Sequence, residues 1–381
     1  MEIEYIWMYL RIAEFVALSY LLLISTYTIG WYRLKKSPPA ELGGQIPVSI
    51  LGAVRNEESN IFNLIQNLSK QYYPLEKIQI IIADDHSEDS TKSKINEAQN
   101  AFPDLNLMHF SAIGTGKKSA LSEALELALG DLVLVTDADC RPGPFWVSQM
   151  VASYREGNAK LLLGPVLFDP ANTIFEKIQT LEFISLMGST AGAAGIGLPM
   201  MGNSANLGFD RNAVINAGGF NASSGFSSGD DVFLLMNIIK NYGRKSVRFV
   251  FSEQAIVSTL PLSSMSAFLS QRLRWVSKSV GYKRPEIILP ALIVFLFNFL
   301  LLSMLFSAVF YPFMALIFLL FILLKYLVDY PLLHAASGFM KRRNLLLFSL
   351  PIEFIYPFYV VIIGLAGNFV KVKWKGRGVK K

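Results

Sequence analysis

The chain has 381 residues, of which 52% are hydrophobic and only 17% are charged. This composition is too apolar for an ordinary soluble protein and predicts membrane-spanning segments. The single cysteine, Cys140, excludes an intramolecular disulfide framework and a cysteine-based zinc site. The net charge of +6 comes mostly from the C-terminal tail and from residues beside the apolar segments, which predicts attraction to anionic lipid head groups rather than to nucleic acid.

The first apolar segment, residues 5–30, is long enough to cross a bilayer as an N-terminal transmembrane helix. A cleaved signal peptide is the alternative, but the apolar run is long and no small-residue cleavage site closes it. Glu2 and Glu4 precede the helix, and three basic residues follow it: Arg33, Lys35 and Lys36. The positive-inside rule then predicts an integral protein of the inner or plasma membrane whose middle domain lies in the cytoplasm.

Residues 46–260 have the pattern of one globular domain in which β-rich runs alternate with helical ones. Strands are predicted at 47–54, 77–85, 105–110, 131–139 and 159–170. Helices are predicted at 59–71, from Ser87 onward, and at 117–129, 174–187 and 227–243. Because the strands are continuously apolar, we expect an α/β fold with a parallel sheet buried on both faces. Ser227 or Ser228 is expected to cap the last helix and Gly243 to end it.

Polar side chains follow three of these strands at the carboxyl end, which is the edge where ligands bind in parallel sheets. The residues are Arg55, Asn56 and Glu57 after the first strand, Asp84 and Asp85 after the second, and Asp137 and Asp139 after the fourth. If the strands are neighbours, these side chains line one cleft. Asp84 and Asp85 have a second interpretation, as local caps of the helix that begins near Ser87.

Asp137 and Asp139 place two like charges one residue apart, which is costly unless a cation or hydrogen-bond donors compensate them. Hard divalent ions take oxygen ligands, and Mg²⁺ commonly uses one or two carboxylates together with substrate phosphates. We therefore interpret the pair as a site for a metal–diphosphate complex. A solvated loop with strand-ending aspartates is the alternative.

The stretch IGTGKKSAL (113–121) is close to a phosphate-binding loop but departs from the pattern G-x-x-x-x-G-K-[ST] at two positions. Ser111 stands where glycine is required, and Lys118 stands where a hydroxyl is required. Two interpretations remain open. Either Lys117 approaches a diphosphate, or Lys117 and Lys118 are a solvated pair.

Beyond the middle domain, residues 262–284 have an amphipathic pattern that predicts an interfacial helix along the bilayer surface. The C-terminal membrane region, residues 287–368, contains apolar segments at 287–308, 310–332 and 346–368. The basic loop at 341–343 is expected in the cytoplasm, which fits two crossings after a cytoplasmic domain, and two interpretations of the last segment remain open. Either it is a re-entrant hairpin, which keeps the basic tail, 369–381, in the cytoplasm, or it crosses fully and the charge rule fails here. A third full crossing would place the tail outside, against the charge rule.

Seven short motifs follow one another in the chain: AVRNEES (53–59), ADDHSEDST (83–91), GKKSAL (116–121), TDADC (136–140), GGF (218–220), GDDVFLL (229–235) and QRLRW (271–275). In this order they resemble family 2 glycosyltransferases, and in particular the membrane-embedded group that includes ceramide glucosyltransferase and the cellulose, chitin and hyaluronan synthases. The resemblance covers residues 46–282. It implies a GT-A fold, a nucleotide-diphosphate sugar as donor, usually a UDP-sugar, and Mg²⁺ or Mn²⁺ as cofactor.

The resemblance also implies a role for each matching residue. The donor-binding residues would be Arg55, Glu57, Asp85, Lys117 and Asp137. The metal site would be Asp137 and Asp139, with Asp139 as the direct ligand. The catalytic acids would be Asp230 and Asp231, with Asp231 as the base. The residues that frame the acceptor and the leaving diphosphate would be Gln271, Arg274 and Trp275, although a surface helix with Arg and Trp anchors also explains that motif.

Two departures from the family pattern bear on the acceptor. Asp230, preceded by Gly229, replaces the usual Glu, and Phe233 stands where the synthases often have an acid. We therefore expect transfer of a hexosyl unit to a lipid or lipid-linked acceptor at the cytoplasmic face, with segment 188–201 and the interfacial helix framing a lipid-entry groove. A processive polysaccharide synthase is the alternative, and a non-catalytic sugar-nucleotide-binding scaffold is the third hypothesis. No nucleic-acid partner and no particular oligomeric state is predicted.

Overall fold

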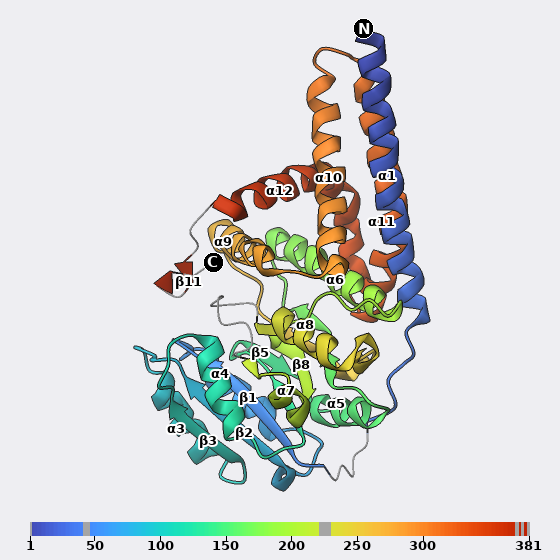
Figure 1. Cartoon of the computed structure of the whole chain (residues 1–381). Helices are drawn as coiled ribbons and strands as arrows, with labels where there is room; N and C mark the ends of the chain where they lie inside the picture. Colours follow the sequence, from blue (N-terminus) through green and yellow to red (C-terminus); the bar gives the residue numbers. More distant parts are fainter. Residues whose placement is uncertain (1, 41–45, 221–229, 370–372, 375–376, 379–381) are drawn as a thin grey trace. The chain divides into compact units, whose positions relative to one another are not determined.

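The computed structural model describes residues 2–40, 46–220, 230–369, 373–374 and 377–378. The chain divides into two compact units (Figure 1). The sheet unit comprises Leu34–Ala171, Gly197–Pro261 and Lys373–Lys381, and the helical unit comprises Met1–Arg33, Asn172–Ile196 and Leu262–Val372. Residues 172–196, which we expected inside the domain 46–260, therefore group with the apolar helices.

In the described part of the chain, the sheet unit is built on a seven-stranded sheet with the order β3-β2-β1-β4-β8-β6-β9. Its strands are β1 (Val48–Val54), β2 (Ile78–Asp84), β3 (Asn106–Ser111), β4 (Leu132–Val135), β6 (Leu161–Leu163), β8 (Leu207–Asp210) and β9 (Val247–Phe249). The strands β3, β2, β1 and β4 pair in parallel, as predicted, whereas β8 runs antiparallel to both β4 and β6. The sequence did not predict β8, and its antiparallel pairing makes the sheet mixed.

The segment 159–170, predicted as one strand, forms two. After β6 the chain passes through Gly164 and Pro165 and continues as β7 (Val166–Phe168), which joins a second sheet, β5-β10-β7. Its other strands are β5 (Cys140–Pro142) and β10 (Val257–Thr259). Pro165 has no backbone N–H for a strand ladder, and its carbonyl oxygen accepts a hydrogen bond from the buried Asn206 side chain. This break lets one apolar run serve two sheets.

Four of the helices described in the sheet unit lie close to predicted positions, whereas those at 146–155 and 211–216 were not predicted. The described helices of this unit are α2 (Ile61–Ser69), α3 (Thr91–Ala101), α4 (Lys117–Glu126), α5 (Trp146–Arg155), α7 (Arg211–Asn216) and α8 (Asp230–Tyr242). Gly243 follows α8 with φ of 79°, a conformation that suits glycine, as expected for a helix end. The predicted caps Ser227 and Ser228 lie outside the described residues.

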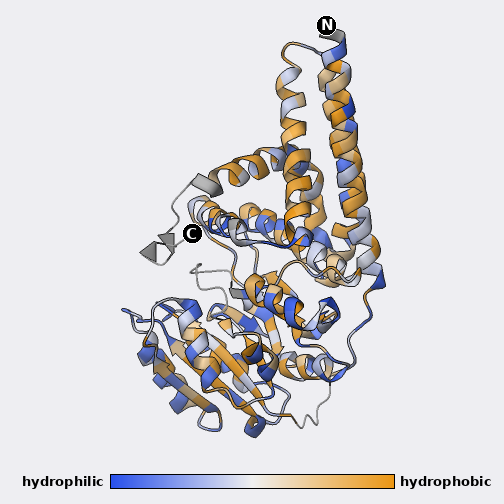
Figure 2. Cartoon of the chain, viewed as in Figure 1, coloured by the Kyte–Doolittle hydropathy of each residue, from blue (hydrophilic) through white to orange (hydrophobic). Residues whose placement is uncertain are grey.

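The helical unit consists of α1 (Glu2–Arg33), α6 (Ile174–Gly195), α9 (Met265–Ser277), α10 (Pro285–Ser307), α11 (Phe313–Phe339) and α12 (Ser349–Phe369). Among the described residues, four segments are long and apolar enough to cross a membrane: Glu4–Arg33, Pro285–Ser307, Phe313–Phe339 and Arg343–Gly367. Figure 2 shows the hydrophobic character of these helices. The C-terminal part of α12 runs across the direction of α10 rather than along it (Figure 1).

Glycines allow α1 and α6 to approach closely. A side-chain carbon at Gly192 of α6 would lie 2.3 Å from the carbonyl oxygen of Tyr27 in α1, and one at Gly30 would lie 2.0 Å from the carbonyl oxygen of Gly192. Gly188 faces Leu332 and Ala336 of α11. These small residues thus serve helix–helix packing, which requires that backbones come close.

Candidate functional site

The polar strand ends are brought together because their strands are neighbours. In the sheet register Val54 of β1 pairs with Asp84 of β2, and Leu51 of β1 pairs with Val135 of β4. The three strands are parallel, so their carboxyl ends share one edge of the sheet. The residues that follow them, 55–57, 85 and 137–139, therefore lie along that edge, as the sequence predicted.

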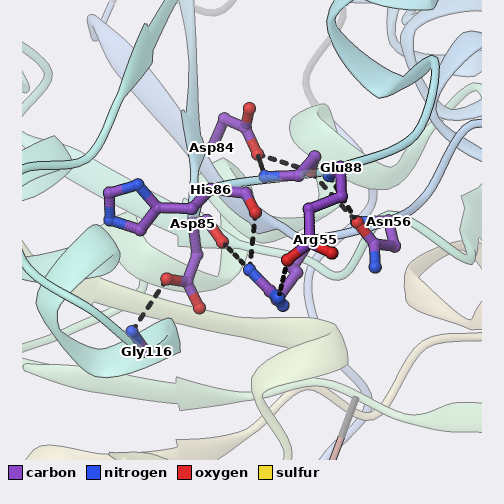
Figure 3. Close-up of polar contacts among 8 residues, drawn as sticks. Arg55, Asn56, Asp84, Asp85, His86, Glu88 and Gly116 are labelled. Atoms are coloured by element: carbon purple, nitrogen blue, oxygen red, sulfur yellow. Dashed lines mark hydrogen bonds and ion pairs between the residues drawn. The ribbon is translucent and has the colours of Figure 1, made fainter. Parts of the chain in front are cut away.

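Arg55 holds the loop that follows β2 through hydrogen bonds from its guanidinium group. Its side chain is 7% exposed, and its Nη1 donates to the carbonyl oxygens of Asp85 at 2.9 Å and His86 at 2.5 Å. Its Nη2 lies 2.8 Å from the carboxylate of Glu88 (Figure 3). The guanidinium is thus used to fix the shape of the β2–α3 loop, where His86 has a positive φ of 55°.

The two aspartates after β2 have different tasks. Asp84 accepts hydrogen bonds from the backbone N–H of Ser87 at 3.0 Å and from its hydroxyl at 2.5 Å. It therefore fixes the turn after β2, and the capping interpretation is wrong because α3 begins only at Thr91. The Asp85 side chain is 2% exposed and accepts from the backbone N–H of Gly116 at 2.9 Å (Figure 3). Asp85 therefore positions the residue that immediately precedes Lys117.

Lys117 is paired rather than solvated. Its Nζ donates to Asp137 Oδ1 at 2.5 Å and to Ser204 Oγ at 2.7 Å. The side chain of Lys117 is 18% exposed and that of Asp137 is 32% exposed, so both remain reachable from solvent. Ser204, which the sequence did not single out, precedes β8 and joins the site because β8 pairs with β4.

Asp137 and Asp139 occupy a turn after β4, in which the Cys140 backbone N–H donates to the Asp137 carbonyl oxygen at 3.0 Å. Burial, together with the nearby charges of Asp137 and Glu57, raises the pKa of Asp139 from 3.8 to about 6. Thr259 and Lys117 act in the opposite direction. Thr259, also absent from the predicted site, reaches it because β10 pairs with β5 beside Cys140.

The residues present fit a divalent cation bound together with phosphates. The described residues contain no group of three or more His, Cys, Asp or Glu side chains arranged to hold a metal. Asp137 and Asp139 offer hard oxygen ligands. The raised pKa of Asp139 reflects burial first and then the negative charges of Asp137 and Glu57, which a cation would offset. Mg²⁺ and Mn²⁺ suit such oxygen sites, and Mg²⁺ commonly takes its remaining ligands from water and substrate phosphate.

Asp231 lies in the first turn of α8 and belongs to the same unit. Its Oδ1 accepts a hydrogen bond from the backbone N–H of Val232 at 2.8 Å. A side-chain carbon at Gly202 would lie 3.6 Å from the Asp231 carbonyl oxygen, so α8 begins beside the segment that leads to Ser204. Asp230 is the first residue of the helix.

The remaining predicted residues, Gln271, Arg274 and Trp275, lie on α9 in the helical unit. The neighbouring Arg272 is buried and forms an ion pair of 2.5 Å with Glu182 of α6, and its guanidinium carbon lies 4.2 Å from the centre of the Trp275 ring. Neither Glu182 nor Arg272 was predicted. Their pairing joins residues 90 positions apart in the chain, and no local sequence pattern predicts it.

The chain is similar in sequence to known glycosyltransferases. Residues 49–215 match the family described as Glycosyl transferase family 2. The chain is 39% identical over 103 residues, 26% of its length, to a β-monoglucosyldiacylglycerol synthase of Trichormus variabilis. It is 26% identical over 125 residues, 33% of its length, to glycosyltransferase AglE of Haloferax volcanii. These matches span only 22% and 41% of the relatives' own lengths.

Among solved structures, the chain is similar to a mannosyltransferase of Pyrobaculum calidifontis in complex with GDP-Man and Mn²⁺. The TM-score is 0.59 at 16% identity, over 94% of this chain and 98% of the other. The mixed α/β sheet and this likeness define the fold as GT-A, as expected. Residues 49–215 are a family 2 glycosyltransferase domain.

Proposed function

We propose that the chain is an inverting, membrane-bound glycosyltransferase. It transfers a hexosyl unit from a nucleotide-diphosphate sugar, with a UDP-sugar as the first candidate, to a lipid or lipid-linked acceptor at the cytoplasmic face. The observation that carries this proposal is the convergence of Lys117, Asp137 and Asp139 at the carboxyl edge of the parallel strands. A positive charge beside paired carboxylates suits a diphosphate bound with a divalent cation.

On the donor side, Arg55 and Asp85 hold the loops that would surround the nucleotide. Glu57 and Asp85 are the candidate contacts to the nucleoside, and Lys117 is the candidate contact to the diphosphate. Asp137 and Asp139 would hold Mg²⁺ or Mn²⁺. When bound, the cation supplies positive charge that offsets the charge developing on the departing diphosphate.

The transfer step requires a base opposite the leaving group. We assign Asp231 to this role, with Asp230 beside it. The oxygen of the acceptor hydroxyl bonds to the anomeric carbon, and Asp231 accepts the proton of that hydroxyl. The bond from that carbon to the diphosphate breaks through an oxocarbenium-like transition state, and the nucleoside diphosphate leaves. Arg274 would stabilise the leaving group, and Gln271 and Trp275 would frame the acceptor, since an aromatic ring suits the apolar face of a sugar.

A lipid acceptor is supported by the four membrane-length helices in the described part of the chain and by the similarity to the β-monoglucosyldiacylglycerol synthase of Trichormus variabilis. Diacylglycerol is therefore the first acceptor to test. The basic residues after α1, namely Arg33, Lys35 and Lys36, support a cytoplasmic sheet unit through the positive-inside rule. The expected surroundings are membrane lipids of the inner or plasma membrane.

The test uses the full chain purified in detergent, with each common labelled UDP-sugar and dioleoylglycerol, with and without Mn²⁺. We expect an organic-soluble glycolipid whose formation depends on the metal. A high-mass, glycosidase-sensitive product would instead identify a polysaccharide synthase. Absence of any sugar transfer, with retained UDP-sugar binding, would favour the non-catalytic scaffold.

The matching variant is Asp231→Asn, which keeps the side-chain size and removes the base. We expect transfer to fall by at least about 10²-fold while the affinity for UDP, measured by calorimetry, is retained. Asp104→Asn, an exposed acid between α3 and β3, is the control and should retain full activity. Normal turnover of the Asp231→Asn variant would remove Asp231 from the base role.

A further inference from the structure

Arg272 contacts two other side chains of the QRLRW motif, Gln271 and Trp275. Its Nη1 donates to Gln271 Oε1 at 2.6 Å, and its guanidinium carbon lies 4.2 Å from the centre of the Trp275 ring. It also lies 4.6 Å from the centre of the Phe268 ring, one turn earlier on α9. One buried guanidinium, 3% exposed, therefore holds an amide and an aromatic ring at once.

The charge of Arg272 is balanced from other helices. Glu182 of α6 lies 2.5 Å from Arg272 Nη2, with its side chain 8% exposed. The other carboxylate oxygen of Glu182 accepts a hydrogen bond from the hydroxyl of Tyr359 in α12 at 3.1 Å. The Tyr359 ring in turn stacks on Phe268 at 5.8 Å. The cluster thus fixes α9 against two helices.

This geometry restricts the two motif side chains. Because the oxygen of the Gln271 amide accepts a hydrogen bond from Arg272, the NH₂ group of Gln271 is the end that is turned away from Arg272. Because a planar guanidinium stacks on one face of Trp275, the indole is held in one orientation. A lysine at position 272 would keep the charge but lose the fork geometry and the stacking surface.

We propose that Glu182 and Arg272 are positioning residues that set the orientation of Gln271 and Trp275 for the acceptor. This rests on the proposed function, in which those two side chains frame the acceptor. Neither positioning residue belongs to the sheet unit, where the donor-binding residues lie. Substitution of Glu182 or Arg272 therefore weakens acceptor binding and leaves the affinity for the nucleotide sugar unchanged.

The kinetic test compares Glu182→Gln, Arg272→Lys and Tyr359→Phe with the parent chain, using UDP-sugar and dioleoylglycerol in mixed micelles. We expect the acceptor KM to rise roughly tenfold in Glu182→Gln and Arg272→Lys, because a tenfold change corresponds to the free energy of about one lost cation–π contact. The rise should be smaller in Tyr359→Phe. The donor KM should stay within about twofold, since the donor residues are untouched. Tyr359→Phe deletes a single hydroxyl, so it tests the cluster even if Glu182→Gln fails to fold.

The matched control is Glu353→Gln. Glu353 lies in the same unit and forms a buried 2.6 Å ion pair with Lys325, yet it is not among the Arg272 contacts. Its substitution removes a comparable pair and should leave the acceptor KM unchanged. An equal rise of acceptor KM in Glu353→Gln, or no rise in folded Glu182→Gln and Arg272→Lys, would overturn the proposal.

A second measurement needs no turnover, so it separates this inference from the proposed function. Glu182→Gln should change the intrinsic tryptophan emission of the purified chain, because the guanidinium is no longer held on the Trp275 ring. The same change should be absent when Glu182→Gln is made in a Trp275→Phe background. If the emission difference persists without Trp275, the coupling of Glu182 to that ring is disproved, whether or not the chain transfers sugar to the lipid.

Discussion

The ammonium group of Lys117 lies 2.5 Å from Asp137 Oδ1 and 2.7 Å from Ser204 Oγ. A lysine at the start of α4 thereby bridges the turn after β4 and the turn before β8. In the described structure this lysine offsets part of the negative charge around Asp139, which also lies near Glu57. In the proposed function, the Lys117–Asp137 pair links donor binding to the protonation of the candidate metal ligand.

Lys117→Met should weaken nucleotide binding and move its pH dependence. The charge of Lys117 lowers the pKa of Asp139, so its removal raises that pKa further and leaves Asp137 without its cation. We expect UDP affinity in the presence of Mn²⁺ to fall by about tenfold at pH 6 and by less at pH 8, measured by calorimetry. Lys118→Met makes the same charge change one residue along and serves as the control. Equal losses in the two variants would contradict the specific role of Lys117.

Metal binding should depend on the protonation of Asp139. Its pKa of about 6 means that the metal-free chain holds a proton there below pH 6, and a ligating carboxylate must lose that proton. The apparent Mn²⁺ affinity should therefore be constant above about pH 7 and fall roughly tenfold for each unit below about pH 5. Titration of Mn²⁺ binding between about pH 4 and about pH 8 in the presence of UDP provides the measurement. A pH-independent affinity would exclude Asp139 as a ligand that must ionise.

The same raised pKa affects folding stability. Because the folded chain holds the Asp139 proton more tightly than the unfolded chain, stability of the metal-free protein should decline as pH rises from about 4 to about 6 and stay level above that range. Asp139→Asn removes this penalty. We expect its melting temperature at pH 7.5 without metal to exceed that of the parent chain, and the stabilising effect of added Mn²⁺ with UDP to be lost. A lower melting temperature than the parent would contradict this reasoning.

Arg55→Met should destabilise the sheet unit. The variant leaves the carbonyl oxygens of Asp85 and His86 without their guanidinium donor in a largely buried setting. We expect the free energy of unfolding to fall by about 3 kcal/mol, measured by denaturant titration in detergent, with weaker UDP binding because Asp85 holds Gly116. Arg248→Met removes an exposed ion pair with Glu156 and should cost less than about 1 kcal/mol. Comparable losses of unfolding free energy in the two variants would mean that the Arg55 hydrogen bonds stabilise the protein no more than an exposed ion pair does.

Gly192→Ala should disrupt the packing of α1 on α6. Its added carbon would lie 2.3 Å from the Tyr27 carbonyl oxygen, so the helices must separate, at a cost of about 1–3 kcal/mol or more. The expected result is a lower melting temperature in detergent. Gly143→Ala is the matched control, since a carbon there meets nothing within 4 Å. Equal melting temperatures for the two variants would refute the close-packing argument.

The amino-acid sequence determined the local features of this protein. Continuous apolar runs specified β1, β2 and β4, and the polar residues after them specified the candidate site, because parallel neighbours end at one edge. Long apolar runs specified the membrane-length helices in the same way. These features depend on residues close together in the chain, where periodicity and length carry the information.

Only the tertiary structure decided which distant strands, helices and side chains contact one another. The division of segment 159–170 between two sheets, the antiparallel direction of β8, and the pairing of Lys117 with Ser204 all depend on contacts between distant segments. The same holds for Glu182 with Arg272, and for the glycines of α6 that face α1. A polar side chain is satisfied by whichever group the fold places beside it, and a sequence pattern does not specify that neighbour.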